Sequence, residues 1–219
     1  MEPQIAELLR SERYARTAAS LQSTLAAVGA DLRAPDESRR LRGARELSTL
    51  ARAELSWMKL PVRAFFVSAA TCRDLEDALD ASTSQTRIAL LIAIKNAYER
   101  YVVHPMWREV HQESDATAWS SWLQLLGGRF MMGPDLMLRA EAAYLLALSG
   151  DERAWQVYLE IVPRRSALLG HLEFAILRCP DSRTPEMRAA LVDLADDVER
   201  RHPKQAHTAS DVRSALART

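Results

Sequence analysis

Hydrophobic positions recur at helical spacing along most of this chain, and proline or glycine separates the segments. Three helices are expected in the first part of the chain: from Pro3 to about Val28 with Gly29 as its stop, from an N-cap at Asp36 to about Leu60, and from Val62 to Leu79. Pro61 is expected to separate the second helix from the third.

The most apolar segment runs from about Gln85 to Val103 and is closed by Pro105. Ile88, Leu91 and Ile92 form one stripe, and other apolar residues occupy the remaining faces. A helix that is apolar nearly all round belongs in the middle of a fold, so we expect this helix to be buried.

In the C-terminal third, the residue pattern predicts regular helices that end at turn residues. They are expected at Asp135–Ser149, Asp151–Val162, Ser166–Cys179 and Pro185–Arg201, the last capped by Thr184, with a frayed helix at Ala209–Thr219. Between this part and the central helix we expect a short helix at Met106–Gln112 and another around Trp119–Leu126 that ends at Gly127-Gly128.

The chain therefore reads as all-α, with about 8–10 helices in antiparallel pairs, either as a helical bundle or as a short α-α superhelix. We expect one domain over residues 1–219. The irregular stretch 127–134 is where a sub-domain junction would fall, between an N-terminal lobe (1–126) and a repeat-like C-terminal lobe (135–219).

One stretch carries a repeat-like motif. Leu138-Arg139-Ala140-Glu141-Ala142-Ala143 precedes Gly150-Asp151 and an Ala/Leu helix, and over about residues 138–162 this resembles HEAT-like repeats of the phycobilisome-lyase type. A tetratricopeptide repeat fits the stretch 143–163 nearly as well, and an ordinary helix hairpin fits it too. The resemblance implies a surface that binds peptides or domains.

Charge and composition narrow the possible functions. Formal net charge is zero and residues 64–160 hold 8 basic and 13 acidic groups, so no strong field attracts nucleic acid, although the sequence does not exclude it. The densest basic cluster is Arg39, Arg40, Arg42 and Arg45, which is either a patch for a phosphate or acidic partner or a solvated face beside Asp36, Glu37 and Glu46.

The chain is expected to be a cytoplasmic protein without a membrane partner. It begins without a basic, apolar signal segment, and its longest dense apolar run, 88–94, is too short to cross a bilayer. Cys72 and Cys179 are far apart in apolar contexts, which is typical of free thiols in a reducing compartment. Arginine greatly outnumbers lysine, which suggests a bacterial source.

Motifs for metals, cofactors and phosphates are missing from the sequence. It has no HExxH, CxxC, GxGxxG or P-loop pattern, and His104 and His111 flank Pro105, so one regular helix cannot present both. We expect no cofactor and no metal.

One catalytic alternative rests on Asn96, Arg100 and His104, spaced i, i+4, i+8 on the central helix. The Arg-to-His spacing, with Tyr101 in the polar position after the arginine, resembles that of HEPN-like helical ribonucleases, which implies metal-independent RNA cleavage. Arg165 and His171 have a similar spacing, but Ser166 replaces the Asn, His or Asp that the family has after the arginine. This reading requires the three side chains to converge in a cleft. The other reading is a helix end where Arg100 and His104 bond to carbonyls and acids.

Aromatic and methionine residues suggest where a protein would bind. They gather around the irregular stretch: Trp107, Trp119, Trp122, Phe130, Met131 and Met132. Trp and Met are enriched at protein interfaces, although burial would use the same residues. Trp107, Trp119 and Trp122 near Asp115 also resemble the lesion-holding residues of HEAT-like alkylpurine DNA glycosylases, but this segment is net acidic.

Because catalytic motifs are absent, the sequence favours a non-enzymatic protein-binding module. A scaffold or adaptor, an immunity protein and an inhibitor all fit this description. Its partner would be another protein or a second copy of the chain, as a homodimer.

Overall fold

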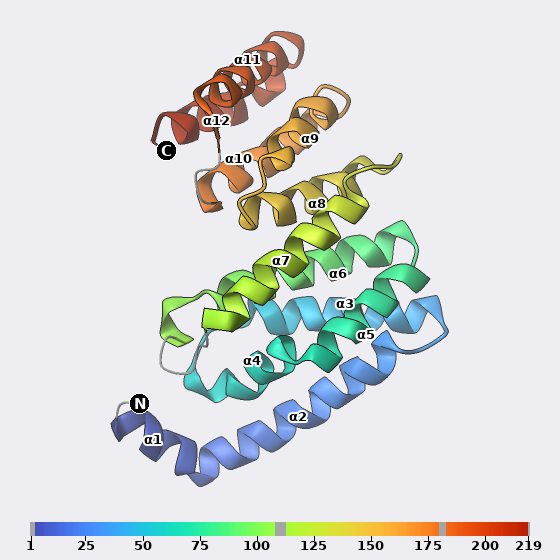
Figure 1. The fold of residues 1–219 in the computed structure, drawn as a ribbon, viewed down its shortest axis with the longest axis vertical. Helices are drawn as coiled ribbons and strands as arrows, with labels where there is room; N and C mark the ends of the chain where they lie inside the picture. Colours follow the sequence, from blue (N-terminus) through green and yellow to red (C-terminus); the bar gives the residue numbers. More distant parts are fainter. Residues whose placement is uncertain (1–2, 108–112, 180–182, 219) are drawn as a thin grey trace. The chain divides into compact units, whose positions relative to one another are not determined.

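The computed structural model describes residues 3–107, 113–179 and 183–218, and these residues form helices and no strand (Figure 1). This confirms the all-α class, with twelve α-helices in the described residues rather than 8–10. The chain divides into two compact units, Met1–Trp119 and Ser120–Thr219. The boundary falls inside helix α7 (Glu113–Phe130), N-terminal to the stretch 127–134.

The first unit holds six helices before α7. They are α1 (Pro3–Arg10), α2 (Glu12–Leu32), α3 (Glu37–Arg52), α4 (Leu60–Val67), α5 (Ala69–Ala81) and α6 (Ser84–Ala97), with short turns η1 (Trp57–Lys59), η2 (Tyr98–Val102) and η3 (Pro105–Trp107). Asp36 caps α3 as expected, its carboxylate accepting from the amides of Ser38 and Arg39.

Some expected boundaries in this unit are wrong. Two serines divide helices that the pattern treats as continuous: the Ser11 hydroxyl caps α2, and the Ser68 hydroxyl caps α5. Gly29 lies inside α2 instead of stopping it, because it does not adopt the positive φ of a glycine stop. The helix begun at Asp36 ends at Arg52, well before Pro61.

Helices α3 and α6 form the main packing pair of the first unit (Figure 1). The carboxylate of Glu37, at the start of α3, accepts hydrogen bonds from the hydroxyls of Thr83 and Thr86, at the start of α6. The two helices therefore begin side by side and run parallel. One side of α6 is fully buried through Leu90, Leu91 and Ile94. Its opposite side is only half-buried, so the central helix is not enclosed all round.

The second unit contains the last helices and the C-terminal part of α7. They are α8 (Leu136–Leu148), α9 (Arg153–Ile161), α10 (Leu169–Arg178), α11 (Pro185–Arg201) and α12 (Ala206–Arg218), with short turns η4 (Ser166–Leu168) and η5 (Pro203–Gln205). Helix α12 is a packed helix against α10 and α11, not a frayed tail, and Ala209 and Val212 are fully buried.

Helices α8 and α9 form an antiparallel hairpin. The turn between them contains Gly150 at φ +76°, a left-handed conformation that suits glycine. The carboxylate of Asp151 then accepts from the Arg153 amide at 3.0 Å. The hydroxyl of Tyr158, near the end of α9, donates a hydrogen bond to the Ala140 carbonyl near the start of α8. The expected helix pair with a Gly-Asp turn is therefore present.

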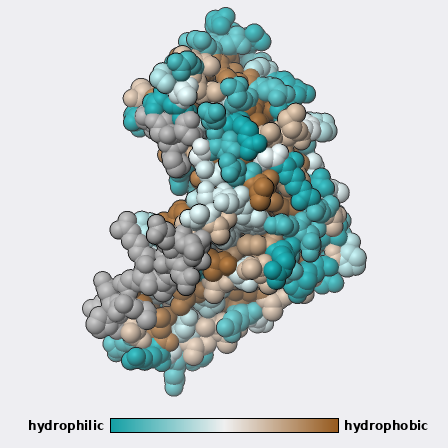
Figure 2. All heavy atoms as spheres, in the orientation of Figure 1, coloured by the Kyte–Doolittle hydropathy of each residue, from teal (hydrophilic) through white to brown (hydrophobic). Residues whose placement is uncertain are grey.

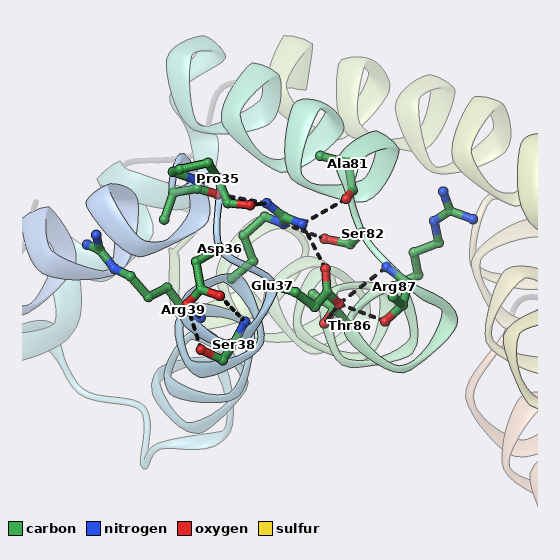
Figure 3. A network of polar contacts seen from close by, with 12 residues as sticks. Pro35, Asp36, Glu37, Ser38, Arg39, Ala81, Ser82, Thr86 and Arg87 are labelled. Atoms are coloured by element: carbon green, nitrogen blue, oxygen red, sulfur yellow. Dashed lines mark hydrogen bonds and ion pairs between the residues drawn. The ribbon is translucent and has the colours of Figure 1, made fainter.

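A buried arginine joins four segments of the first unit. Arg40 is 7% exposed, and all five of its N–H groups have acceptors. The acceptors lie 2.7–3.0 Å away: Ser82 Oγ, Glu37 Oε2 and the carbonyls of Ala34, Pro35 and Ala81. Figure 3 shows Pro35, Glu37, Ala81, Ser82 and Thr86 converging on this point from different helices and turns. Arg40 thus holds the α2–α3 turn against the α5–α6 turn.

Glu37 is held in its ionised form by the same network. Burial alone would raise the pKa of this carboxyl, but hydrogen bonds from Thr86, Thr83 and Arg40 outweigh burial and lower its pKa to about 2. Because the pKa of this carboxyl is lower in the folded protein than in the unfolded chain, its charge stabilises the fold above the unfolded-state pKa. This stabilisation is lost as pH falls through the folded-state pKa.

We expect Glu37→Gln to be less stable than the wild type at pH 7, and the difference to shrink as pH falls from about 5 towards 2. Urea unfolding followed by circular dichroism at each pH measures it. Thr86→Val removes one hydrogen bond to the carboxylate and should move the loss of stability to higher pH. If the free energies of unfolding of the wild type and Glu37→Gln differ by the same amount at every pH, this account is wrong.

Gly127 and Gly128 lie side by side within α7 and offer a matched pair for a packing test. A Cβ added at Gly127 would lie 2.6 Å from Leu146 Cγ and 2.9 Å from the Ala142 carbonyl oxygen, so α7 approaches α8 closely there. A Cβ at Gly128 would meet only the Arg153 guanidinium, at 3.8 Å.

We expect Gly127→Ala to destabilise the protein by about 1–3 kcal/mol through overpacking. Gly128→Ala should be neutral or stabilise it by up to about 1 kcal/mol through helix propensity. Thermal and urea unfolding of the two variants measure the contrast. Equal effects of the two substitutions would show that the close approach at Gly127 does not constrain the helix.

Candidate docking groove

Two neighbouring concavities of about 490 and 310 Å³ lie at the exposed face of α9 in the second unit, and both are lined by Arg153, Gln156 and Leu159. Together they are called the α9 groove. Met131 and Met132 line one end, and Met187 and Ala190 on α11 line the other. The side chain of Met132 is among the most exposed large apolar groups of the described chain, at 68%.

A buried arginine builds the methionine end of the groove. Arg139 on α8 is 3% exposed, and its Nε donates to the Met131 carbonyl at 2.8 Å. Its two Nη atoms form a fork on the carboxylate of Glu160, with Nη1 to Oε1 at 2.9 Å. The hydrogen bond from Arg139 lowers the pKa of Glu160, so the pair is charged at neutral pH. The turn that carries the methionines is thereby tied to both helices of the hairpin.

A second ion pair orders the middle of the groove. Arg153 forks onto Asp151, which also accepts a hydrogen bond from Gln124 at 2.9 Å. The hydrogen bond from Arg153 is the largest of the causes that lower the pKa of Asp151 to about 2. Arg153 is therefore held over the groove instead of moving freely in solvent.

The far wall is the first turn of α11. The Thr184 hydroxyl accepts from the Met187 amide at 3.2 Å, as the sequence predicts for this cap. Because Pro185 starts the helix, Glu186, Met187 and Ala190 follow in the first two turns and face the same concavity.

The groove is lined by charges of both signs. Two arginines, Arg139 and Arg153, line it together with three acids, Glu152, Glu160 and Glu186. Nucleic-acid grooves need an excess of positive charge, and this one has none. On the face drawn in Figure 2, hydrophobic and hydrophilic residues are likewise interspersed. Mixed polarity with exposed methionine is typical of protein-binding surfaces.

The structure brings together only two of the six aromatic and methionine residues proposed for docking. Met131 and Met132 line the groove, whereas Trp122 is half-buried on α7 and Phe130 is buried. Arg129 covers the Phe130 ring, 5.2 Å from its centroid.

Trp107 and Trp119 belong to the first unit and are core residues, which corrects their assignment to a surface. Trp107 stacks on Tyr101, with ring centroids 6.0 Å apart, and its indole donates to the Arg100 carbonyl at 2.8 Å. Trp119 stacks on Tyr98. Burial of large aromatic rings contributes a large favourable free energy, and a short amphipathic pattern in the sequence does not show that they are buried.

The expected basic patch is divided among three environments. Arg40 is buried in its network, while Arg39 and Arg42 both pair with Asp31, with their closest contacts at 3.0 and 2.7 Å. The hydrogen bond from Arg42 is the main cause that lowers the pKa of Asp31. Arg45 lines a cleft between α3 and α6. The cluster therefore does not form one continuous patch.

Asn96, Arg100 and His104 are not presented on one regular helix. Their expected stripe is interrupted because η2 is a π-helical turn, closed by the Val103 amide on the Tyr98 carbonyl. His104 lies beyond it, and its Nδ1 accepts from the Met106 amide at 3.2 Å. This engagement with the backbone fits a helix end better than a catalytic cleft.

The second Arg–His match also has a structural explanation. His171 Nδ1 lies 2.8 Å from the Tyr158 hydroxyl, and Nε2 lies 3.2 Å from Glu141 Oε1. Burial raises the pKa of Tyr158, which favours its neutral hydroxyl in this contact. His171 thus joins α8, α9 and α10 within the second unit.

No group of three His, Cys, Asp or Glu side chains able to hold a metal occurs among the described residues. His111 and its neighbours 108–112 lie outside them. The described chain also contains no helix long and apolar enough to span a membrane.

Sequence reasoning missed the α9 and α11 walls of the groove. The available signal was apolar residues on the polar face of an amphipathic helix: Leu159 lies near Gln156 and Glu160, and Met187 near Glu186. Such single apolar residues are common on surfaces, so only their spatial proximity identifies them.

Arg139 and Arg164 provide a matched test of the groove's construction, because both pair with Glu160. Arg139 is buried, whereas Arg164 is 54% exposed and its Nη1 is 3.7 Å from Glu160 Oε1. We expect Arg139→Gln to cost about 2–3 kcal/mol, since the Met131 carbonyl and Glu160 lose a buried partner. Arg164→Gln should change stability by less than about 0.5 kcal/mol. Urea unfolding measures both, and equal losses would contradict the assigned role of Arg139.

Comparisons with known proteins identify no relative of this chain. No family model, curated protein or solved structure matches it.

Proposed function

We propose that this chain is a non-enzymatic protein-binding module that receives a segment of another protein in the α9 groove. The two adjacent concavities that share α9 residues, with methionine in the lining of each, are the observation that carries the proposal. Methionine is flexible and polarisable, so it adapts to apolar side chains of a partner. Arg153 and Glu186 on the rim supply charges of both signs that would fix the partner's register.

The architecture of the second unit supports this role. In it α8 packs on α9, α12 packs on both α10 and α11, and α9 contacts α11 (Figure 1). A HEAT-like or tetratricopeptide-like origin for residues 138–162 is part of the proposal, because such arrays commonly bind peptides along one layer of helices. We also place the protein in the cytoplasm, where Cys72 and Cys179, which are not in a disulfide, would stay reduced.

The test is affinity capture from the native host with tagged wild type and a Met132→Glu/Met187→Glu variant, followed by mass spectrometry. We expect a stoichiometric protein partner on the wild type and at least about tenfold less on the variant, since a charge replaces apolar contacts at both ends of the groove.

Phe174→Glu is the matched control. Phe174 on α10 is 59% exposed and does not line the groove, so its substitution should leave capture unchanged. Circular dichroism checks that each variant folds. Capture that survives in the double variant, or RNA as the only co-purifying molecule, would count against the proposal.

A further inference from the structure

A separate cleft lies between α3 and α6 in the first unit. Its volume is about 510 Å³, within the range of ligand-binding clefts. Arg45 and Arg52 line it from α3, and Ala89 and Ile92 line it from the half-buried side of α6. None of its lining residues belongs to the α9 groove.

The two arginines give this cleft an uncompensated positive charge. Its lining contains no acidic residue. Within the described chain neither guanidinium is ion-paired, whereas Arg39, Arg40 and Arg42 of the same helix all pair with acids. Arg52 donates only to the Ser48 hydroxyl, at 2.9 Å, which positions it without neutralising it.

The spacing of the arginines defines what can fit. They are seven residues apart on one helix, which corresponds to about 10 Å along its axis. Between them the lining consists of Ser48 and Thr49 on α3 and Ala89 and Ile92 on α6, so the floor is low and its α6 side is apolar. A ligand that fits must place two negative charges about 10 Å apart and small apolar groups between them.

We propose that the α3–α6 cleft docks an acidic helix of a partner protein, which carries two carboxylates seven residues apart and small apolar side chains between them. Each carboxylate meets one arginine, and the small side chains contact the floor. Arginine suits this task because its planar fork pairs with both oxygens of a carboxylate. The proposal does not depend on what occupies the α9 groove.

The experiment uses the full chain against a displayed library of 18-residue helix-forming peptides, with exposed positions varied among Glu, Lys, Ala, Leu and Ser. We expect enriched peptides to carry Glu at positions seven apart with Ala or Leu between them. An enriched peptide, once synthesised, should bind the Arg45→Ala/Arg52→Ala variant about tenfold or more weakly than the wild type. Its affinity for the wild type should fall as salt rises.

Arg13→Ala/Arg16→Ala is the matched control, because it removes the same charge from exposed positions of α2 away from the cleft. It should change the affinity less than about twofold. Three results would overturn the proposal: no enrichment, enrichment without acidic residues, or equal binding by the Arg45→Ala/Arg52→Ala variant. Binding of a single-stranded RNA 20-mer that requires Arg45 and Arg52, without any acidic peptide, would also overturn it and assign the cleft to nucleic acid.

Discussion

A guanidinium removed from water must find an acceptor for nearly every N–H group, and this requirement organises the first unit. Arg40 meets it by drawing the carbonyls of two turns towards one point. Those turns start α3 and α6, so the two helices begin at the same level and run parallel. Arg139 acts in the same way in the second unit, where it fixes the Met131 carbonyl to the α8–α9 hairpin.

Features set by neighbouring residues could be predicted from the sequence. The caps at Asp36 and Thr184 and the turn at Gly150 need only local hydrogen bonds or one allowed backbone conformation. The all-α class follows equally directly, from helical periodicity and scarce glycine. The breaks at Ser11 and Ser68 were not predicted, because a serine inside an apolar pattern reads equally well as a helical residue.

The site could be predicted only in part, since it depends on contacts between distant segments. Met131 and Met132 stand out in an irregular stretch, and they do reach the groove. The neighbouring tryptophans looked equivalent in sequence, but Trp107 is enclosed by aromatic rings from η1 and η2. In the basic cluster, Asp31 is the deciding partner: it lies on α2 and neutralises Arg39 and Arg42, while Arg45 is left facing its cleft.

The burial pattern of the second unit also shows why α9, and not α8, supplies most of the groove lining. Every residue of α8 from Leu138 to Leu148 is buried, and its alanines allow neighbouring helices to pack closely around it. A helix enclosed in this way offers little side-chain surface to a partner, and of its buried stretch only Arg139 lines the groove. Helix α9 buries one face on α8 and leaves Arg153, Gln156 and Glu160 exposed on the other. The small side chains of α8 thus let it pack closely inside the unit, and the opposite face of α9 remains exposed to line the groove.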